Sequence, residues 1–252
     1  MFNIGLKLWS TNFFYAKPAL QLYNQGFFDY VELYIVPGTF TTFAGLWKEL
    51  PFSYMIHAPH TSHNFNLARA ENATSNKIMF KEVINYADKL KAPLIIVHPG
   101  VNGHIAETIS QISDIGDSRI IVENKPAMGL YGERCVGVTA EEIFSIMQHC
   151  GTGFCFDIGH AVCAANTMQT DHNTYIREFL SLDPAMYHIS DGLRDSQKDA
   201  HLHFGTGNYD LAGILALLVA GKRLSIETVK DSNDDLNDFK NDVEYLRRLA
   251  CG

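Results

Sequence analysis

The strongest constraint on the fold is a regular alternation of short apolar segments with segments of helical periodicity. Helical patterns fall mainly at 18–25, 70–90, 139–149, 175–180, 211–220 and 236–249. The expected strands are 4–8, 29–35, 54–57, 94–97, 119–123, 153–157, 185–189 and 223–227. The wholly apolar segment 94–97 is typical of a parallel strand buried on both faces. Strands that alternate with helices in this way predict an α/β fold, the (β/α)8 or TIM barrel, with a doubly wound open sheet as the alternative.

The length of the chain suits one such barrel. The chain has 252 residues, and roughly 250 is typical of a single TIM barrel. Its composition, 46% hydrophobic and 19% charged, is that of a globular protein with enough apolar residues for a core. Because no linker, low-complexity segment or charge block marks a boundary, we expect a single domain over residues 1–252.

Other features bear on location and partners. The N-terminal sequence MFNIGLKLWS lacks the pattern of a signal peptide, and the longest apolar run, 211–220, is about half of the ~20 residues that a membrane helix needs. Five cysteines without C-x-x-C spacing are typical of reduced thiols. We therefore expect a cytoplasmic protein with no membrane partner. The net charge of −8 argues only weakly against nucleic acid, because bound cations would change it where a phosphate binds.

Side chains that can bind metals end six consecutive expected strands, from the third strand onward. They are His57, His98, Glu123, Asp157, His188 and Glu227. In a parallel barrel the carboxyl ends of all strands lie on one face. These side chains are therefore expected to converge at one mouth of the barrel.

Three further candidates lie close to these strand ends. Asp199 and His201 stand two residues apart, so in an extended segment their side chains would project to the same face. His160 follows Asp157 in the motif D-I-G-H, where Gly159 is expected to let the backbone turn. Carboxylate oxygens and imidazole nitrogens are good ligands for zinc or manganese.

Each candidate taken alone has a structural alternative, such as a hydrogen-bonded histidine or a glutamate paired with an arginine. Together, five histidines and four carboxylates in one cavity would place several like charges in a medium of low dielectric. Divalent cations would remove that cost. Nine ligands exceed the four that one zinc ion takes, and with a bridging carboxylate they suit two or three ions, an arrangement typical of displacement at phosphorus.

The motifs as a set resemble the xylose isomerase-like barrel superfamily, and in particular endonuclease IV. They are H-P-G at His98, E-N at Glu123, D-x-x-H at Asp157, H-x-x-D at His188, D-x-H-x-x-x-G-x-G from Asp199, and E-T at Glu227. The resemblance implies three Zn²⁺ sites, with Mn²⁺ possible at some. One site would use His57, His98 and Glu123, the second Asp157, His188, Glu227 and the shared Glu123, and the third His160, Asp199 and His201.

The resemblance also implies a reaction. A hydroxide held by the metals would attack phosphorus, with Glu123, Asp157 and Glu227 as the catalytic carboxylates, and the substrate would be a phosphodiester such as damaged DNA, cleaved 5′ to an abasic site. The sequence departs from that family in having no Arg or Lys between Lys17 and Lys48. His60 and Lys125 also replace more usual residues of the family. Together with His203 on another mouth-side loop, they are candidate substrate contacts.

Two alternatives remain open. The segment F-D-Y-V-E-L, which contains Glu32, is similar to sugar isomerases and epimerases. That resemblance implies one Mn²⁺, Mg²⁺ or Co²⁺ ion on Glu123, Asp157, His188 and Glu227, Glu32 near the substrate, and a small sugar or sugar phosphate as substrate. The other alternative is a non-catalytic barrel that binds a metal or a sugar. The sequence gives no indication of oligomeric state.

Overall fold

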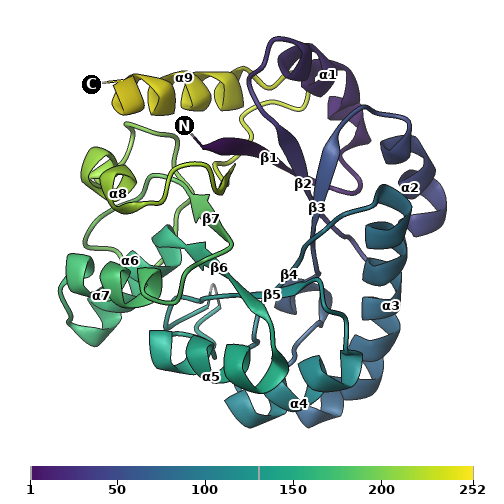
Figure 1. The fold of residues 1–252 in the computed structure, drawn as a ribbon, viewed down its shortest axis with the longest axis vertical. Coiled ribbons are helices and arrows are strands. Elements are labelled where there is room, and N and C mark those ends of the chain that lie inside the picture. The colour runs from purple at the N-terminus through teal and green to yellow at the C-terminus, as the bar shows by residue number, and fades with distance from the viewer. Residues whose placement is uncertain (1, 130, 252) are drawn as a thin grey trace.

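Eight parallel strands form a closed barrel in sequence order, surrounded by helices (Figure 1). The structure is a computed structural model that describes residues 2–129 and 131–251. Each strand pairs with its sequence neighbours, and β1 closes the ring against β8. The strands are β1 Asn3–Trp9, β2 Tyr30–Tyr34, β3 Ser53–His57, β4 Ile95–Val97, β5 Ile120–Glu123, β6 Gly153–Asp157, β7 Met186–Ile189 and β8 Arg223–Ile226. The predicted TIM barrel is confirmed, and the open sheet is excluded.

The helices cover the outside of the barrel. They are α1 Ala16–Asn24, α2 Phe40–Lys48, α3 Ala73–Leu90, α4 Ile105–Ile115, α5 Ala140–Cys150, α6 Ile158–Met168, α7 His172–Leu180, α8 Leu211–Leu217 and α9 Asn237–Cys251. Helix α5 begins with a capping box, in which the Thr139 hydroxyl accepts from the Glu142 amide and the Glu142 carboxylate accepts from the Thr139 amide. No helix in the described part of the chain is long and apolar enough to cross a membrane.

Three helices were not predicted from the sequence, namely α2, α4 and α6. Helix α6 starts directly after β6 without a loop, so the sequence offers no turn signal between them. Helix α2 contains two threonines and a glycine, all of them weak helix formers. Packing of α2 against α3 and of α4 against α5 supplies the stability that local propensity does not.

The barrel interior is filled by one apolar layer beneath the strand-end side chains. Its members are Tyr30, Met55, Ile96, Ile121, Cys155 and Met186. Each lies two residues before an ionisable residue of the same strand or of its end, as Ile121 lies before Glu123 and Met186 before His188. Because side chains alternate between faces of a strand, the two sets share the inward face. The apolar layer thus lies directly beneath the candidate ligands in the barrel.

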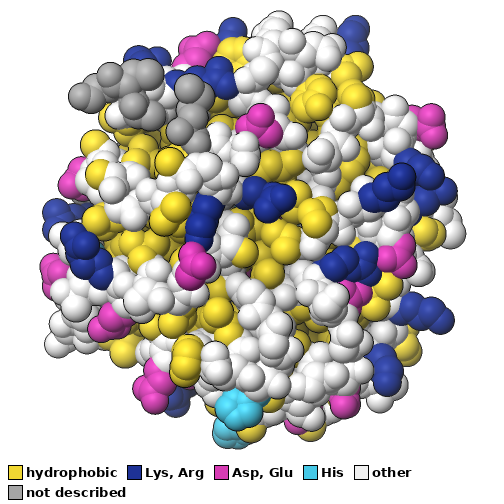
Figure 2. All heavy atoms as spheres, in the orientation of Figure 1, with side chains coloured by type: hydrophobic (Ala, Val, Ile, Leu, Met, Phe, Trp, Pro, Cys, Tyr) yellow, Lys and Arg dark blue, Asp and Glu magenta, His cyan; other side chains and the backbone are white. Residues whose placement is uncertain are grey.

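Figure 2 shows which kinds of side chain cover one end of the barrel. Basic and acidic side chains are scattered over this face around a hydrophobic centre, and histidine side chains appear only near its lower edge. The strand-end histidines therefore do not gather at the centre of this face.

The loops that follow β3 and β4 touch each other next to the site. The backbone amide of His104 donates to the carbonyl of Ala68 at 3.0 Å, and the Asn66 side-chain amide donates to the carbonyl of Val101 at 2.9 Å. A Cβ on Gly103 would lie 1.9 Å from the Ala68 carbonyl oxygen. The contact therefore requires glycine.

We expect Gly103→Ala to lower the free energy of unfolding by about 1–3 kcal/mol, because the new methyl group would push two backbone segments apart. The measurement is the midpoint of chemical denaturation. The matched control is Gly45→Ala on the exposed side of α2, where a Cβ meets nothing within 4 Å and helix propensity should rise. Equal midpoints for the two variants would contradict the expectation.

Candidate metal centre

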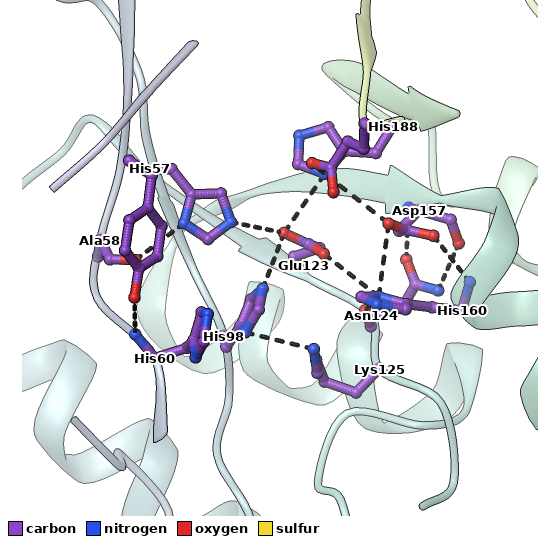
Figure 3. Close-up of polar contacts among 12 residues, drawn as sticks. His57, Ala58, His60, His98, Glu123, Asn124, Lys125, Asp157, His160 and His188 are labelled. Carbon is purple, nitrogen blue, oxygen red and sulfur yellow. Dashed lines mark hydrogen bonds and ion pairs between the residues drawn. The ribbon is translucent and has the colours of Figure 1, made fainter. Parts of the chain in front are cut away.

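Glu123, at the end of β5, lies at the centre of the strand-end cluster (Figure 3). Its Oε2 lies 3.2 Å from Nε2 of His57 and 3.2 Å from Nε2 of His98, and its Oε1 lies 3.2 Å from Nδ1 of His160. Nδ1 of His188 is 3.5 Å from Oε2. A buried carboxylate that meets four imidazoles in this way can bridge neighbouring ions.

The first predicted ligand set comes together. The ligand atoms of His57, His98 and Glu123 lie within 4.8 Å of one another. Nδ1 of His57 lies 2.8 Å from the carbonyl of Ala58, which leaves Nε2 available. Nδ1 of His98 instead lies 3.3 Å from Nζ of Lys125. An ion on Nε2 of His98 would place a proton on Nδ1, so Lys125 would then have to turn away.

The second predicted set converges on Nδ1 of His188, at the end of β7. That nitrogen lies 2.6 Å from Oε1 of Glu227, 3.5 Å from Oε2 of Glu123 and 3.9 Å from Oδ2 of Asp157. Its other ring nitrogen, Nε2, lies 2.9 Å from Oε2 of Glu32. The two nitrogens therefore have separate partners, one set at the mouth of the barrel and the other in its interior.

The third predicted set also comes together, although its backbone differs from the expectation. Oδ2 of Asp199 lies 3.8 Å from Nε2 of His160 and 3.5 Å from Nε2 of His201. His201 has a φ of +47°, so the segment is not extended as predicted. The side chains meet because this left-handed residue turns the backbone, a conformation that costs free energy outside glycine.

The predicted role of Gly159 is wrong. Helix α6 begins at Ile158, and the carboxylate of Asp157 caps it by accepting from the backbone amide of His160 at 2.7 Å. Gly159 does not have a positive φ, so no turn requires it. A Cβ at this position would lie 2.8 Å from Oδ2 of Asp199. Glycine is needed here for the close approach of a candidate ligand.

Several candidate ligand atoms are buried without a hydrogen bond. Among the described residues they include Oδ2 of Asp199 and Nδ1 of His201. A buried polar atom without a partner costs about 1–3 kcal/mol. Divalent ions are natural partners for these oxygens and nitrogens, so the donor set fits such ions.

The close packing of ionisable side chains in the cluster shifts the pKa values of Asp157 and His188. Burial raises the pKa of Asp157 to about 6, and repulsion by Asp199 and Glu123 adds to this effect. Burial also acts to lower the pKa of His188, but the neighbouring Cys155, Glu227 and Glu32 raise it well above its ordinary value. A proton on His188 thus supplies positive charge that cations would otherwise supply.

A cavity of about 660 Å³ lies over the cluster at the carboxyl ends of the strands. Asp157 and His188 lie deeper, and the other predicted ligands line the cavity directly. The lining ligands are His57, His98, Glu123, His160, Asp199, His201 and Glu227. The ligands thus lie at two depths, with Asp157 and His188 beneath those that border the cavity.

The four predicted substrate contacts divide into two pairs. His60 and Lys125 line the cavity, and the His60 ring stacks on His98 with centroids 5.5 Å apart. Burial and the charge of Lys125 lower the pKa of His60 to about 3, so His60 is neutral. Glu32 is fully buried and His203 is held by Asp242 at 2.8 Å, and neither lines the cavity.

Lys7 is a site residue that the sequence analysis missed. It projects from β1 into the cavity and forms ion pairs with Glu227 and, at 3.4 Å, with Glu32. Burial acts to lower the pKa of Lys7, but the carboxylates of Glu227 and Glu32 raise it above its ordinary value. A lysine in the middle of an otherwise apolar strand is unusual, and that was the available signal.

Comparison with known proteins places the chain among enzymes with related barrels. The profile of the family described as xylose isomerase-like TIM barrel matches residues 23–249. A probable endonuclease 4 of Thermoplasma volcanium is 26% identical over 212 residues, which cover 78% of this chain and 73% of that protein. A probable endonuclease 4 of Thermoplasma acidophilum is 29% identical over 182 residues, or 66% of this chain and 62% of that protein.

Solved structures show the same fold. A D-tagatose 3-epimerase-like protein superposes with a TM-score of 0.74 at 19% identity, covering 98% of this chain and 97% of that one. Endonuclease IV from Thermus thermophilus superposes with a TM-score of 0.71 at 16% identity, covering 98% of each. With a family profile that spans most of its length, the chain belongs to the xylose isomerase-like TIM barrel family.

Proposed function

We propose that the protein is a metal-dependent hydrolase of phosphodiester bonds, similar in its metal centre to endonuclease IV. The observation that carries the proposal is the convergence of three ligand groups around or beside Glu123. His57 and His98 adjoin it on one side, and His188 adjoins it on another. The group of His160, Asp199 and His201 lies next to it through the contact of His160 with Glu123.

Up to three Zn²⁺ ions, or Mn²⁺ at some positions, would be held by these residues. His57, His98 and Glu123 would hold one, and Asp157, His188 and Glu227 a second that shares Glu123. His160, Asp199 and His201 would hold the third. Bound ions would supply electrostatic stabilisation of a phosphate and an activated water. The two relatives named as probable endonuclease 4 support this choice.

The side chains of the protein would perform the remaining tasks. Glu123, Asp157 and Glu227 would be the catalytic carboxylates, because they fix the ions and orient the attacking water. Lys125 would turn from His98 toward a phosphate oxygen of the substrate, and neutral His60 would border the same part of the cavity. Both damaged DNA and a smaller phosphodiester fit this chemistry.

A second candidate is a divalent-metal isomerase or epimerase acting on a small sugar or sugar phosphate. It is favoured by the position of Glu123 and Glu227, whose carboxylates both approach Nδ1 of His188 at the cavity floor. Two carboxylates so placed could exchange a proton with a carbon beside a carbonyl. The third ligand group has no task in that reaction, which favours the hydrolase.

The two candidates differ in the reaction that purified, zinc-loaded protein should catalyse. We expect nicking of a duplex that carries one abasic site, or hydrolysis of a small phosphodiester such as bis(p-nitrophenyl) phosphate. A panel of ketoses should remain unchanged under the same conditions. Epimerisation of a ketose without any phosphodiester hydrolysis would contradict the hydrolase and support the second candidate.

The metal content should depend on individual ligands. Protein purified without added metal should contain more than one equivalent of zinc by elemental analysis. Asp199→Asn should lose about one equivalent, because it weakens the third group alone, whereas Glu123→Gln should lose more, because Glu123 serves two ions. The control is His149→Gln, an exposed histidine on α5 outside the cluster. A single equivalent in the unaltered protein would contradict the trinuclear centre.

A further inference from the structure

The floor of the metal centre contains an ion-pair network in which the proposed reaction uses Glu227 but gives no role to Lys7 or Glu32. Lys7 of β1, Glu32 of β2 and Glu227 after β8 meet there, and Lys7 contacts both carboxylates. The side chain of Glu32 is completely buried, and that of Lys7 is 18% exposed. A buried carboxylate destabilises the folded protein unless it is paired with a positive charge, and here Lys7 supplies that charge.

Glu32 fixes the orientation of one candidate ligand. Its Oε2 lies 2.9 Å from Nε2 of His188, and the same oxygen accepts from the hydroxyl of Ser225, which in turn contacts the hydroxyl of Tyr30 at 2.9 Å. A carboxylate on Nε2 places the ring proton there. Nδ1 of His188 then points to Glu227, Glu123 and Asp157, and it would offer its lone pair once an ion took the place of its proton.

Lys7 stands where the geometry would otherwise admit an ion. Ligand atoms of Glu32, His188 and Glu227 lie within 4.8 Å of one another, so this group by itself has the spacing of a metal site. The ammonium of Lys7 contacts both carboxylates of the group. A divalent cation placed between them would meet a positive charge at close range.

We infer that Lys7 and Glu32 are positioning residues that define the number and place of the bound ions. Glu32 holds His188 with Nδ1 toward the mouth, and Lys7 acts as a built-in cation that excludes an ion from the floor. The inference rests on the proposed metal centre. It assigns the ions to the mouth side of Glu227, where they can meet a substrate, and not to the side that faces Glu32.

The test uses three variants of the full-length protein, Lys7→Met, Glu32→Gln and the double variant. Metal-free protein is titrated with zinc against a competing chelator, and the melting temperature is recorded with and without zinc. Lys7→Met should melt lower without metal, because Glu32 and Glu227 then repel each other. It should also gain more on zinc addition than the unaltered protein, and bind an additional equivalent.

Glu32→Gln should have the opposite signature. Its zinc affinity should fall roughly 10- to 100-fold at one site, because His188 loses its orienting partner. The double variant should bind no additional ion, because the group of Glu32, His188 and Glu227 has then lost the carboxylate of Glu32. Lys7→Arg, which keeps the charge, should restore the stoichiometry of the unaltered protein. The matched control is Lys81→Met, on the exposed face of α3.

The outcomes separate the two levels of the argument. If the unaltered protein binds zinc and Lys7→Met matches it in stoichiometry and in thermal response, the role of Lys7 is overturned while the metal centre stands. Undiminished zinc affinity in Glu32→Gln overturns the role of Glu32 in the same way. If the unaltered protein binds no zinc, the metal centre and the inference fall together.

Discussion

The repulsion among buried carboxylates is the constraint on which the rest of this structure depends. Asp157, Glu123 and Glu227 are brought together by the carboxyl ends of a parallel barrel, Asp199 joins the cluster from the segment between β7 and α8, and Glu32 lies just beneath. Such a cluster is tolerable only with positive charge among its members. In the protein alone that charge comes from Lys7 and from protonated histidine, and divalent ions can supply it at the mouth.

The fold meets this constraint with rigidity. The strand-end ligands from His57 to His188 each follow a member of the packed apolar layer by two residues, so the core beneath them is already filled. Hydrogen bonds from the outer nitrogens then fix the rings, as in the contact of His160 with the carbonyl of Asn124 at 2.9 Å. Asn124 also bonds to the backbone of Asp157 in both directions, which extends the pairing of β5 and β6 past its last residues.

The two candidate reactions would both use the deep ligands around His188, and they differ in whether they need the group of His160, Asp199 and His201. Phosphodiester hydrolysis gives a task to the group of His160, Asp199 and His201, which lies to one side of the shared carboxylate. Proton transfer on a sugar needs only the deeper group around His188. The close approach of Asp199 to Gly159, which leaves no room for a Cβ, indicates that the chain is built to keep the group of Asp199 in place.

Local pattern determined the barrel and the six strand-end candidate ligands, because burial on both faces is a property of short segments. It also singled out His160, Asp199 and His201, but not the backbone that brings them together. It did not reveal α2, α4 and α6, whose stability comes from packing, or the left-handed backbone of His201. It also could not reveal the contacts of Lys7 and Glu32 beneath the site. Lys7 contacts Glu227, which lies 220 residues away in the sequence, and Glu32 contacts His188, which lies 156 residues away. Only closure of the barrel brings β1, β2, β7 and β8 together, so only the tertiary structure decided which charges stand beneath the metal centre.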